Sequence, residues 1–201
     1  MTNGERRDGA LTPEDYLWAH QLLEKVTPLR RDCGVLCERI CCRGLEEKAG
    51  MYLFPGEESL FPGGEDWYEL EWHPVAEREF CPDWNGKLEQ VGFLICNGTC
   101  PRDRRPLACR LFPLAADVAE VAEVAEGTAG GTVDVSLDSD AAVMCPLVRH
   151  ATIDQLDPKF IAACRDVYRR LARDSLILAD LRWQSRRRRE SLSEPWRGLL
   201  Q

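Results

Sequence analysis

The sequence has few histidines and no long hydrophobic run. Histidine occurs three times in 201 residues, each time alone. No apolar segment approaches the roughly 20 residues needed to span a bilayer, and the first eight residues lack the apolar stretch of a signal peptide. A glycine-rich nucleotide loop is also missing. These absences argue against a membrane or exported protein, and we expect a cytoplasmic one.

Apart from its cysteines, the composition is that of an ordinary globular protein. Hydrophobic residues make up 44% and charged residues 30%, and there are six tryptophans, which excludes a collagen-like or wholly disordered chain. A chain of 201 residues can build a core without disulfide support, so its ten cysteines need another explanation. In a reducing compartment, clustered thiols indicate metal binding or redox chemistry rather than structural disulfides.

The hydrophobic pattern predicts helices near both ends of the chain. A helix begins at Thr12-Pro13, with acids in its first turn, and ends before Pro28. A second begins at Asp157-Pro158 and carries one apolar stripe that includes Cys164. A third is expected over residues 175–189.

Alternating hydrophobic and polar residues predict strands in the middle of the chain. They occur over residues 68–72, 91–95 and 133–137. Residues 114–121 fit either a helix face or a strand, and we favour a hairpin with 133–137 because a lone strand is unstable.

The predicted fold class is α+β, a helical scaffold with a small antiparallel sheet and irregular, metal-organised cysteine loops. Residues 1–30 would supply the N-terminal helix, residues 31–150 the cysteine-rich region with the sheet, and residues 151–201 the C-terminal helices. We expect these three parts to form one compact domain.

Eight cysteines fall into two groups and one outlying position. Four occur within ten residues and three within fourteen, while the eighth precedes Pro146. Thiolates bind zinc and iron–sulfur clusters, four to a tetrahedral zinc, so eight could complete two sites. The adjacent Cys41 and Cys42 favour two neighbouring metals or one multinuclear cluster, because consecutive side chains point in different directions. The predicted metal ligands are Cys33, Cys37, Cys41, Cys42, Cys96, Cys100, Cys109 and Cys145.

Other residues near these groups admit two interpretations. Cys81 is as readily a ligand as an ordinary thiol, whereas Cys164 is expected in the core. His73 is expected to be a surface or hydrogen-bonded histidine rather than a ligand, and Glu57 a turn carboxylate rather than an acid–base group. The arginines between residues 102 and 110 would either offset the charge of metal-bound thiolates or be solvated.

Three segments together resemble the CxxCxxCC cysteine-cluster family, also called YkgJ-like proteins. They are Cys33–Cys42, Met51–Glu57 and Cys96–Pro113, in which the Arg-Pro-x-x-Cys-Arg-x-Phe-Pro element from Arg105 is the most specific part. The resemblance extends to Cys145-Pro-Leu147 and implies chelation of zinc or iron by eight cysteines. Some relatives are associated with lysine methylation of flagellin, which makes a methylating activity a weaker implication.

The first cysteine group departs from that family pattern. Its spacing is CxxxCxxxCC, so each gap is one residue longer, and the ligand roles of Cys33 and Cys37 depend on how the chain accommodates the extra residues. The segment also differs from the CxxxCxxC signature of radical S-adenosylmethionine enzymes, because Ile40 occupies the position of the third cysteine.

Three functions follow from these features. The first is a metal-chelating protein that binds zinc or an iron–sulfur cluster, with metal ions and a possible protein as partners. The second is an iron–sulfur-dependent protein-modifying enzyme, such as a lysine N-methyltransferase, so the sequence leaves open whether the protein is an enzyme. The third is a binding module that uses the run Arg186–Arg189, for which a solvated helix end is the simpler interpretation. The net charge of -8 and the absence of interleaved aromatics argue against nucleic acid.

Overall fold

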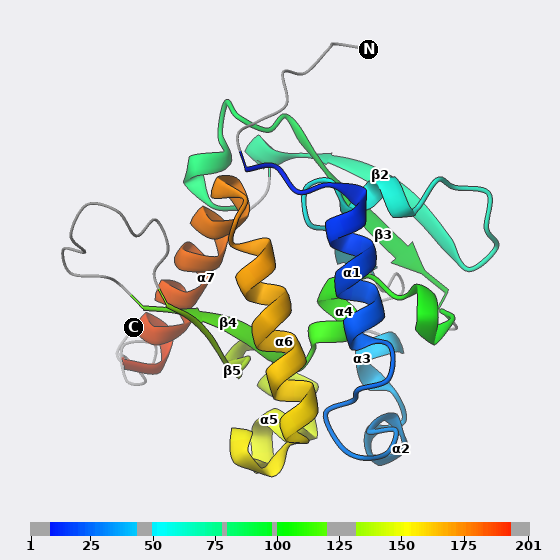
Figure 1. Cartoon of the computed structure of the whole chain (residues 1–201), viewed down its shortest axis with the longest axis vertical. Helices are drawn as coiled ribbons and strands as arrows, with labels where there is room; N and C mark the ends of the chain where they lie inside the picture. Colours follow the sequence, from blue (N-terminus) through cyan, green and yellow to red (C-terminus); the bar gives the residue numbers. More distant parts are fainter. Residues whose placement is uncertain (1–8, 44–49, 78–79, 98–99, 120–131, 194–201) are drawn as a thin grey trace, which may run out of the picture.

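The chain folds into helices packed on two small antiparallel sheets (Figure 1). The computed structural model describes residues 9–43, 50–77, 80–97, 100–119 and 132–193. Within them, three longer helices are α1 (Pro13–Leu23), α6 (Pro158–Leu171) and α7 (Ser175–Ser193). The shorter helices are α2 (Gly34–Cys37), α3 (Ile40–Arg43), α4 (Leu107–Leu111) and α5 (Pro146–His150). This arrangement confirms the α+β class.

Two of the longer helices, α1 and α6, begin where their capping residues predict. The Thr12 side chain accepts a hydrogen bond from the Asp15 backbone N–H, and Asp157 accepts one from Lys159, with proline next to each cap. The helix α7 continues to Ser193, beyond the predicted end at Arg189. In Figure 1, α6 lies between α1 and α7, and it packs against α1.

The first sheet has three strands in the order β1–β3–β2. Its strands are β1 (Gly50–Tyr52), β2 (Tyr68–Pro74) and β3 (Gln90–Cys96). The sequence predicts β2 and β3, but β1 is too short to show alternation. Gly50 in β1 has to be glycine, because a Cβ there would lie 2.4 Å from Cζ of the Phe93 ring.

The second sheet confirms the preference for a hairpin pairing over a helix. Strand β4 (Leu114–Val118) pairs antiparallel with β5 (Val133–Leu137), and Leu114 lies opposite Leu137. The predicted extension of β4 to residue 121 and the connection to β5 lie outside the described residues. The described residues thus form two small sheets where one was expected, and α6 packs against β5 while α7 packs against β4.

The arginine run at the end of α7 is tied to the second sheet. Arg188 is 9% exposed and donates a hydrogen bond from Nη2 to the Ala116 carbonyl (2.6 Å). Arg189 pairs with Asp117 at 2.7 Å, and Arg187 lies 4.7 Å from the centre of the Trp183 ring. The interpretation of this run as a solvated helix end is therefore wrong for Arg188 and Arg189, which hold α7 against β4.

The main hydrophobic core lies where α1, α4, α6 and α7 meet the second sheet. Cys164, on α6, is fully buried there, and its Sγ lies 4.0 Å from the Leu111 carbonyl. The apolar stripe of the helix predicts this position. No helix among the described residues is both long enough and apolar enough to cross a membrane.

A change at Cys164 tests this assignment to the core. Cys164→Ala should lower the free energy of unfolding by roughly 1 kcal/mol, because a small apolar side chain nearly fills the site. Cys164→Ser should cost more, since its shorter side chain carries a hydroxyl too far from the Leu111 carbonyl for a hydrogen bond. Urea denaturation of both variants measures the difference, and equal tolerance of alanine and serine would contradict an apolar surrounding.

Candidate metal centre

The first cysteine group lies on two short helices joined by a sharp turn. Cys33 caps α2 and Cys37 ends it, so the four-residue spacing of the two corresponds to about one helical turn. Glu38 (φ 50°) and Arg39 (φ 59°) both adopt left-handed backbone conformations, which are uncommon without glycine. Helix α3 then presents Cys41 and Cys42. The first of the longer gaps is thus a helical turn, and the second passes through the left-handed turn at Glu38 and Arg39.

The remaining predicted ligands come from three other segments. Cys96 is the last residue of β3, Cys109 lies within α4 and Cys145 caps α5. Cys100 follows β3 and precedes Pro101. The expectation of irregular cysteine loops is therefore corrected, because most of these thiols lie in or at the ends of short helices and a strand.

Four thiols from two segments lie close enough to influence one another's ionisation. Cys42 interacts with Cys41 and Cys100, and Cys100 also interacts with Cys96. The Arg105 Nε donates to the Cys100 Sγ at 3.2 Å. A guanidinium group therefore lies directly against the group of sulfur atoms.

The other four predicted ligands are Cys33, Cys37, Cys109 and Cys145, and they adjoin this group. Three of them, Cys33, Cys37 and Cys145, line an apolar cavity of about 30 Å³ together with Cys41, so Cys41 belongs to both sets. Cys109 interacts electrostatically with Cys100 and Cys41. Shared cavities and electrostatic interactions thus link these cysteines to one another, although they span more than a hundred residues and are not arranged as a metal site.

Burial and hydrogen bonding move the thiol pKa values in opposite directions. Burial raises the pKa of Cys33 to about 11 and that of Cys109 to about 12. Hydrogen bonds with Cys42 and Cys96, together with the Arg105 charge, lower the pKa of Cys100. A hydrogen bond with Cys42, followed in importance by the Arg105 charge, lowers the pKa of Cys41 to about 7. The thiolate form is therefore favoured at Cys41, which belongs to both sets of cysteines, and at its neighbour Cys100.

The donor atoms of this group are cysteine sulfurs, which are the ligands that zinc and iron–sulfur clusters prefer. As they stand, no three or more His, Cys, Asp or Glu side chains in the described part of the chain are placed to hold a metal ion. The cysteines are free thiols that interact with one another, whereas a bound metal would be held by thiolates about 2.3 Å from it. Arg110 nevertheless has a buried Nη2 without a hydrogen-bond partner and lines a cavity of about 70 Å³ with Cys33, Cys41 and Cys109.

The arginines near Cys100 are engaged rather than simply solvated. Arg104 forms an ion pair with Glu65, and Arg102 donates to the Val26 carbonyl at 3.1 Å. Arg110 donates to the carbonyls of Arg105 (2.8 Å) and His20 (3.1 Å). Among these arginines, Arg105 contacts a sulfur atom, so charge compensation at the thiols is supported for Arg105, while the others are held by carbonyl and carboxylate groups.

Cys81 and His73 lie in other surroundings. Cys81 is buried in an apolar cluster with Trp84 and Leu176, so the structure does not bring it to the other thiols. The His73 Nδ1 is 2.9 Å from the Tyr52 hydroxyl, and its ring stacks on Phe93. This confirms the interpretation of His73 as a hydrogen-bonded histidine.

The sequence does not reveal the structural role of Glu57. This carboxylate is fully buried and accepts hydrogen bonds from the backbone N–H groups of Leu107 (2.7 Å) and Phe54 (3.1 Å). Its Oε1 also lies 3.4 Å from Nε2 of His20. Glu57 therefore fixes the start of α4, which carries Cys109. One signal was available: in the near-repeat Leu-Phe-Pro-Gly, Glu57 stands where the second copy has glycine.

Replacing Glu57 tests whether it holds the centre together. Glu57→Ala should lower the free energy of unfolding by about 2–4 kcal/mol, because two buried backbone N–H groups lose their charged acceptor. Glu57→Gln should cost less, since its amide oxygen can keep one bond. Urea denaturation measures both changes. Glu69→Ala, at an exposed glutamate, is the control and should hardly change the free energy of unfolding. An equally small change in Glu57→Ala would contradict the structural role of this carboxylate.

Comparisons with known proteins leave the site to be interpreted from its own chemistry. The chain matches no protein-family model, no curated protein and no solved structure. The features that bear on its function are therefore the cysteine group, the arginines beside it and the motif between Cys33 and Leu147.

Proposed function

We propose that the protein chelates metal, with the eight cysteines binding zinc or an iron–sulfur cluster. The observation that carries the proposal is the meeting of thiols from four separate segments beside Arg105. Soft thiolates are the ligands that zinc and iron–sulfur clusters prefer. The resemblance of Cys33–Leu147 to the cysteine-cluster family supports the same chemistry.

Weak hydrophobic packing of the first cysteine group also supports the proposal. Helices α2 and α3 have four residues each, too few to be stable by themselves. Val35 is 79% exposed and Leu36 is 57% exposed, and α3 has no buried residue. Burial of apolar surface therefore stabilises this segment little. Bonds from its four thiols to metal would fix it to β3 and α4, and metal binding would contribute directly to folding.

The charge around the thiols agrees with bound metal. Four thiolates on one zinc leave a net charge of -2, which needs compensation when it is partly buried. Arg105 donates to a sulfur, and Arg110 lines the adjoining cavity. The protein would thus supply the ligands, their orientation through the short helices, and guanidinium groups that offset the thiolate charge.

Metal content of purified protein tests the proposal directly. Anaerobically purified wild type should contain zinc or iron by elemental analysis, and visible absorption separates the two because zinc is spectroscopically silent. Cys100→Ser should lose metal, since the variant removes the thiol that interacts with both Cys42 and Cys96. Cys81→Ser and Cys164→Ala, at the cysteines outside the group, should retain the full content. Metal-free wild type, or equal losses in all three variants, would overturn the proposal.

Metal removal should loosen the centre before the helical core. After chelation, limited proteolysis should cleave between residues 50 and 145 well before it cleaves α6, because α6 is anchored by apolar packing and by ion pairs that do not involve the thiols. Mass spectrometry of the fragments locates the cuts. Digestion that does not change after metal loss has been verified would count against a structural role for the metal.

A further inference from the structure

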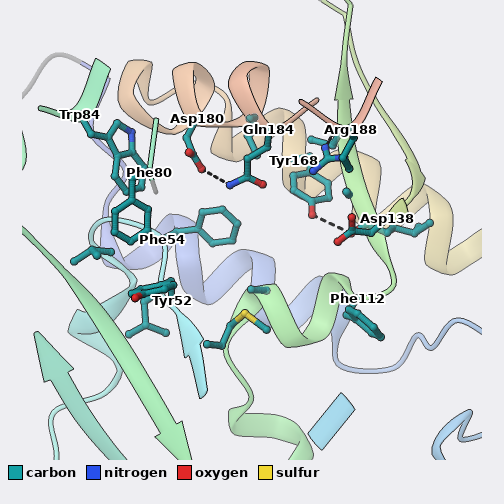
Figure 2. A pocket seen from close by; sticks show the side chains of 18 residues that line it. Tyr52, Phe54, Phe80, Trp84, Phe112, Asp138, Tyr168, Asp180, Gln184 and Arg188 are labelled. Carbon is teal, nitrogen blue, oxygen red and sulfur yellow. Dashed lines mark hydrogen bonds between the residues drawn. The ribbon is translucent and has the colours of Figure 1, made fainter. Parts of the chain in front are cut away.

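A second site is suggested by a cavity of about 220 Å³ that no cysteine lines. It is lined by residues of β1, β3, β4, α4, α6 and α7 and by neighbouring turns. Figure 2 shows aromatic rings around it from several segments. The aromatic lining residues are Tyr52, Phe54, Phe80, Trp84, Phe112 and Tyr168.

One carboxylate in this cavity has an unused acceptor atom. Asp180 is 6% exposed, and its Oδ2 accepts a hydrogen bond from the Gln184 Nε2 at 2.6 Å. Its Oδ1 is buried without a hydrogen bond of good geometry among the described residues, although the Cys81 backbone N–H interacts with the carboxylate. Figure 2 shows Asp180 and Gln184 directed from α7 into the space between the rings. A buried carboxylate oxygen without a donor is costly, so a donor from a ligand would be favourable there.

The charges that line the cavity favour a positively charged donor. Asp138 and Asp180 provide two carboxylates, against one guanidinium from Arg188. Arg188 Nη2 is already committed to the Ala116 carbonyl. Burial raises the pKa of Asp180 to about 6, with the Cys81 backbone N–H and Gln184 partly opposing the shift. The carboxylate is thus mainly ionised at neutral pH and lacks a protein cation of its own at Oδ1.

We propose that this cavity binds a small organic ammonium ion, with its N–H donating to Oδ1 of Asp180 and its apolar part lying between the aromatic rings. Aromatic faces attract cations, and an aromatic wall with carboxylate acceptors favours an amine over a neutral molecule of the same shape. The cysteines form no part of this site, so the assignment does not depend on the metal.

Benzylamine is a suitable probe because it combines one ring with one ammonium group. Full-length wild type should bind it in a ¹H–¹⁵N NMR titration, with shifts at the Gln184 amide side chain and the Trp84 indole N–H. Benzyl alcohol, the neutral analogue, should bind at least about tenfold more weakly, since a neutral donor gains less from a buried carboxylate. Benzoate, an anion, should not bind.

The isosteric Asp180→Asn removes the charge and should weaken benzylamine binding by about tenfold or more. Asp166→Asn, at an exposed aspartate of α6, is the matched control and should bind as wild type does. Equal binding of amine and alcohol, preference for benzoate, no binding of benzylamine, or full binding by Asp180→Asn would each overturn the proposal. The wild-type comparison of the three probes decides the matter even if Asp180→Asn fails to fold.

Discussion

The arrangement of the cysteine region depends on the hydrogen bonds that the buried carboxylate of Glu57 accepts. A charged group without exposed surface is tolerated only when hydrogen bonds replace its water. Glu57 meets this requirement with the N–H groups of Phe54 and Leu107, and it lies beside His20. One side chain therefore joins α1, the turn between β1 and β2, and the start of α4. The position of Cys109 relative to the other thiols follows from this junction.

The cysteine region and the helical core are stabilised by different forces. Around α6 the side chains are apolar and fully buried, so hydrophobic burial accounts for the order of that part. The segment of α2 and α3 has little such burial, and its thiols face one another and Arg105 instead. Unless the thiols hold a metal, this segment depends on weak thiol hydrogen bonds and on its short helices.

The sequence predicts the parts of the fold that local rules determine. The caps at Thr12 and Asp157 set the starts of α1 and α6, and alternation predicts β2, β3 and β5. The strand β1 and the helices α2 and α3 are too short to carry a period. The contacts of Glu57 with Leu107 and of Arg188 with Ala116 join residues far apart in the chain, so no local pattern could predict them. The grouping of eight cysteines was predictable because metal chemistry favours clustered thiols.

Helix α4 contributes to both the proposed metal centre and the aromatic cavity, although it has only five residues. Leu107 and Leu111 are fully buried in the core, while Cys109 lies among the thiols. Ala108 and the following Phe112 line the cavity that contains Asp180. Because a close-packed interior transmits small displacements, a shift of Cys109 on metal binding would also move this wall of the cavity. The buried Glu57 limits such a shift, since its bond to Leu107 fixes the first turn of the helix. The same short helix thus carries Cys109 and contributes Ala108 to the wall of the aromatic cavity, so a displacement of α4 would reach both.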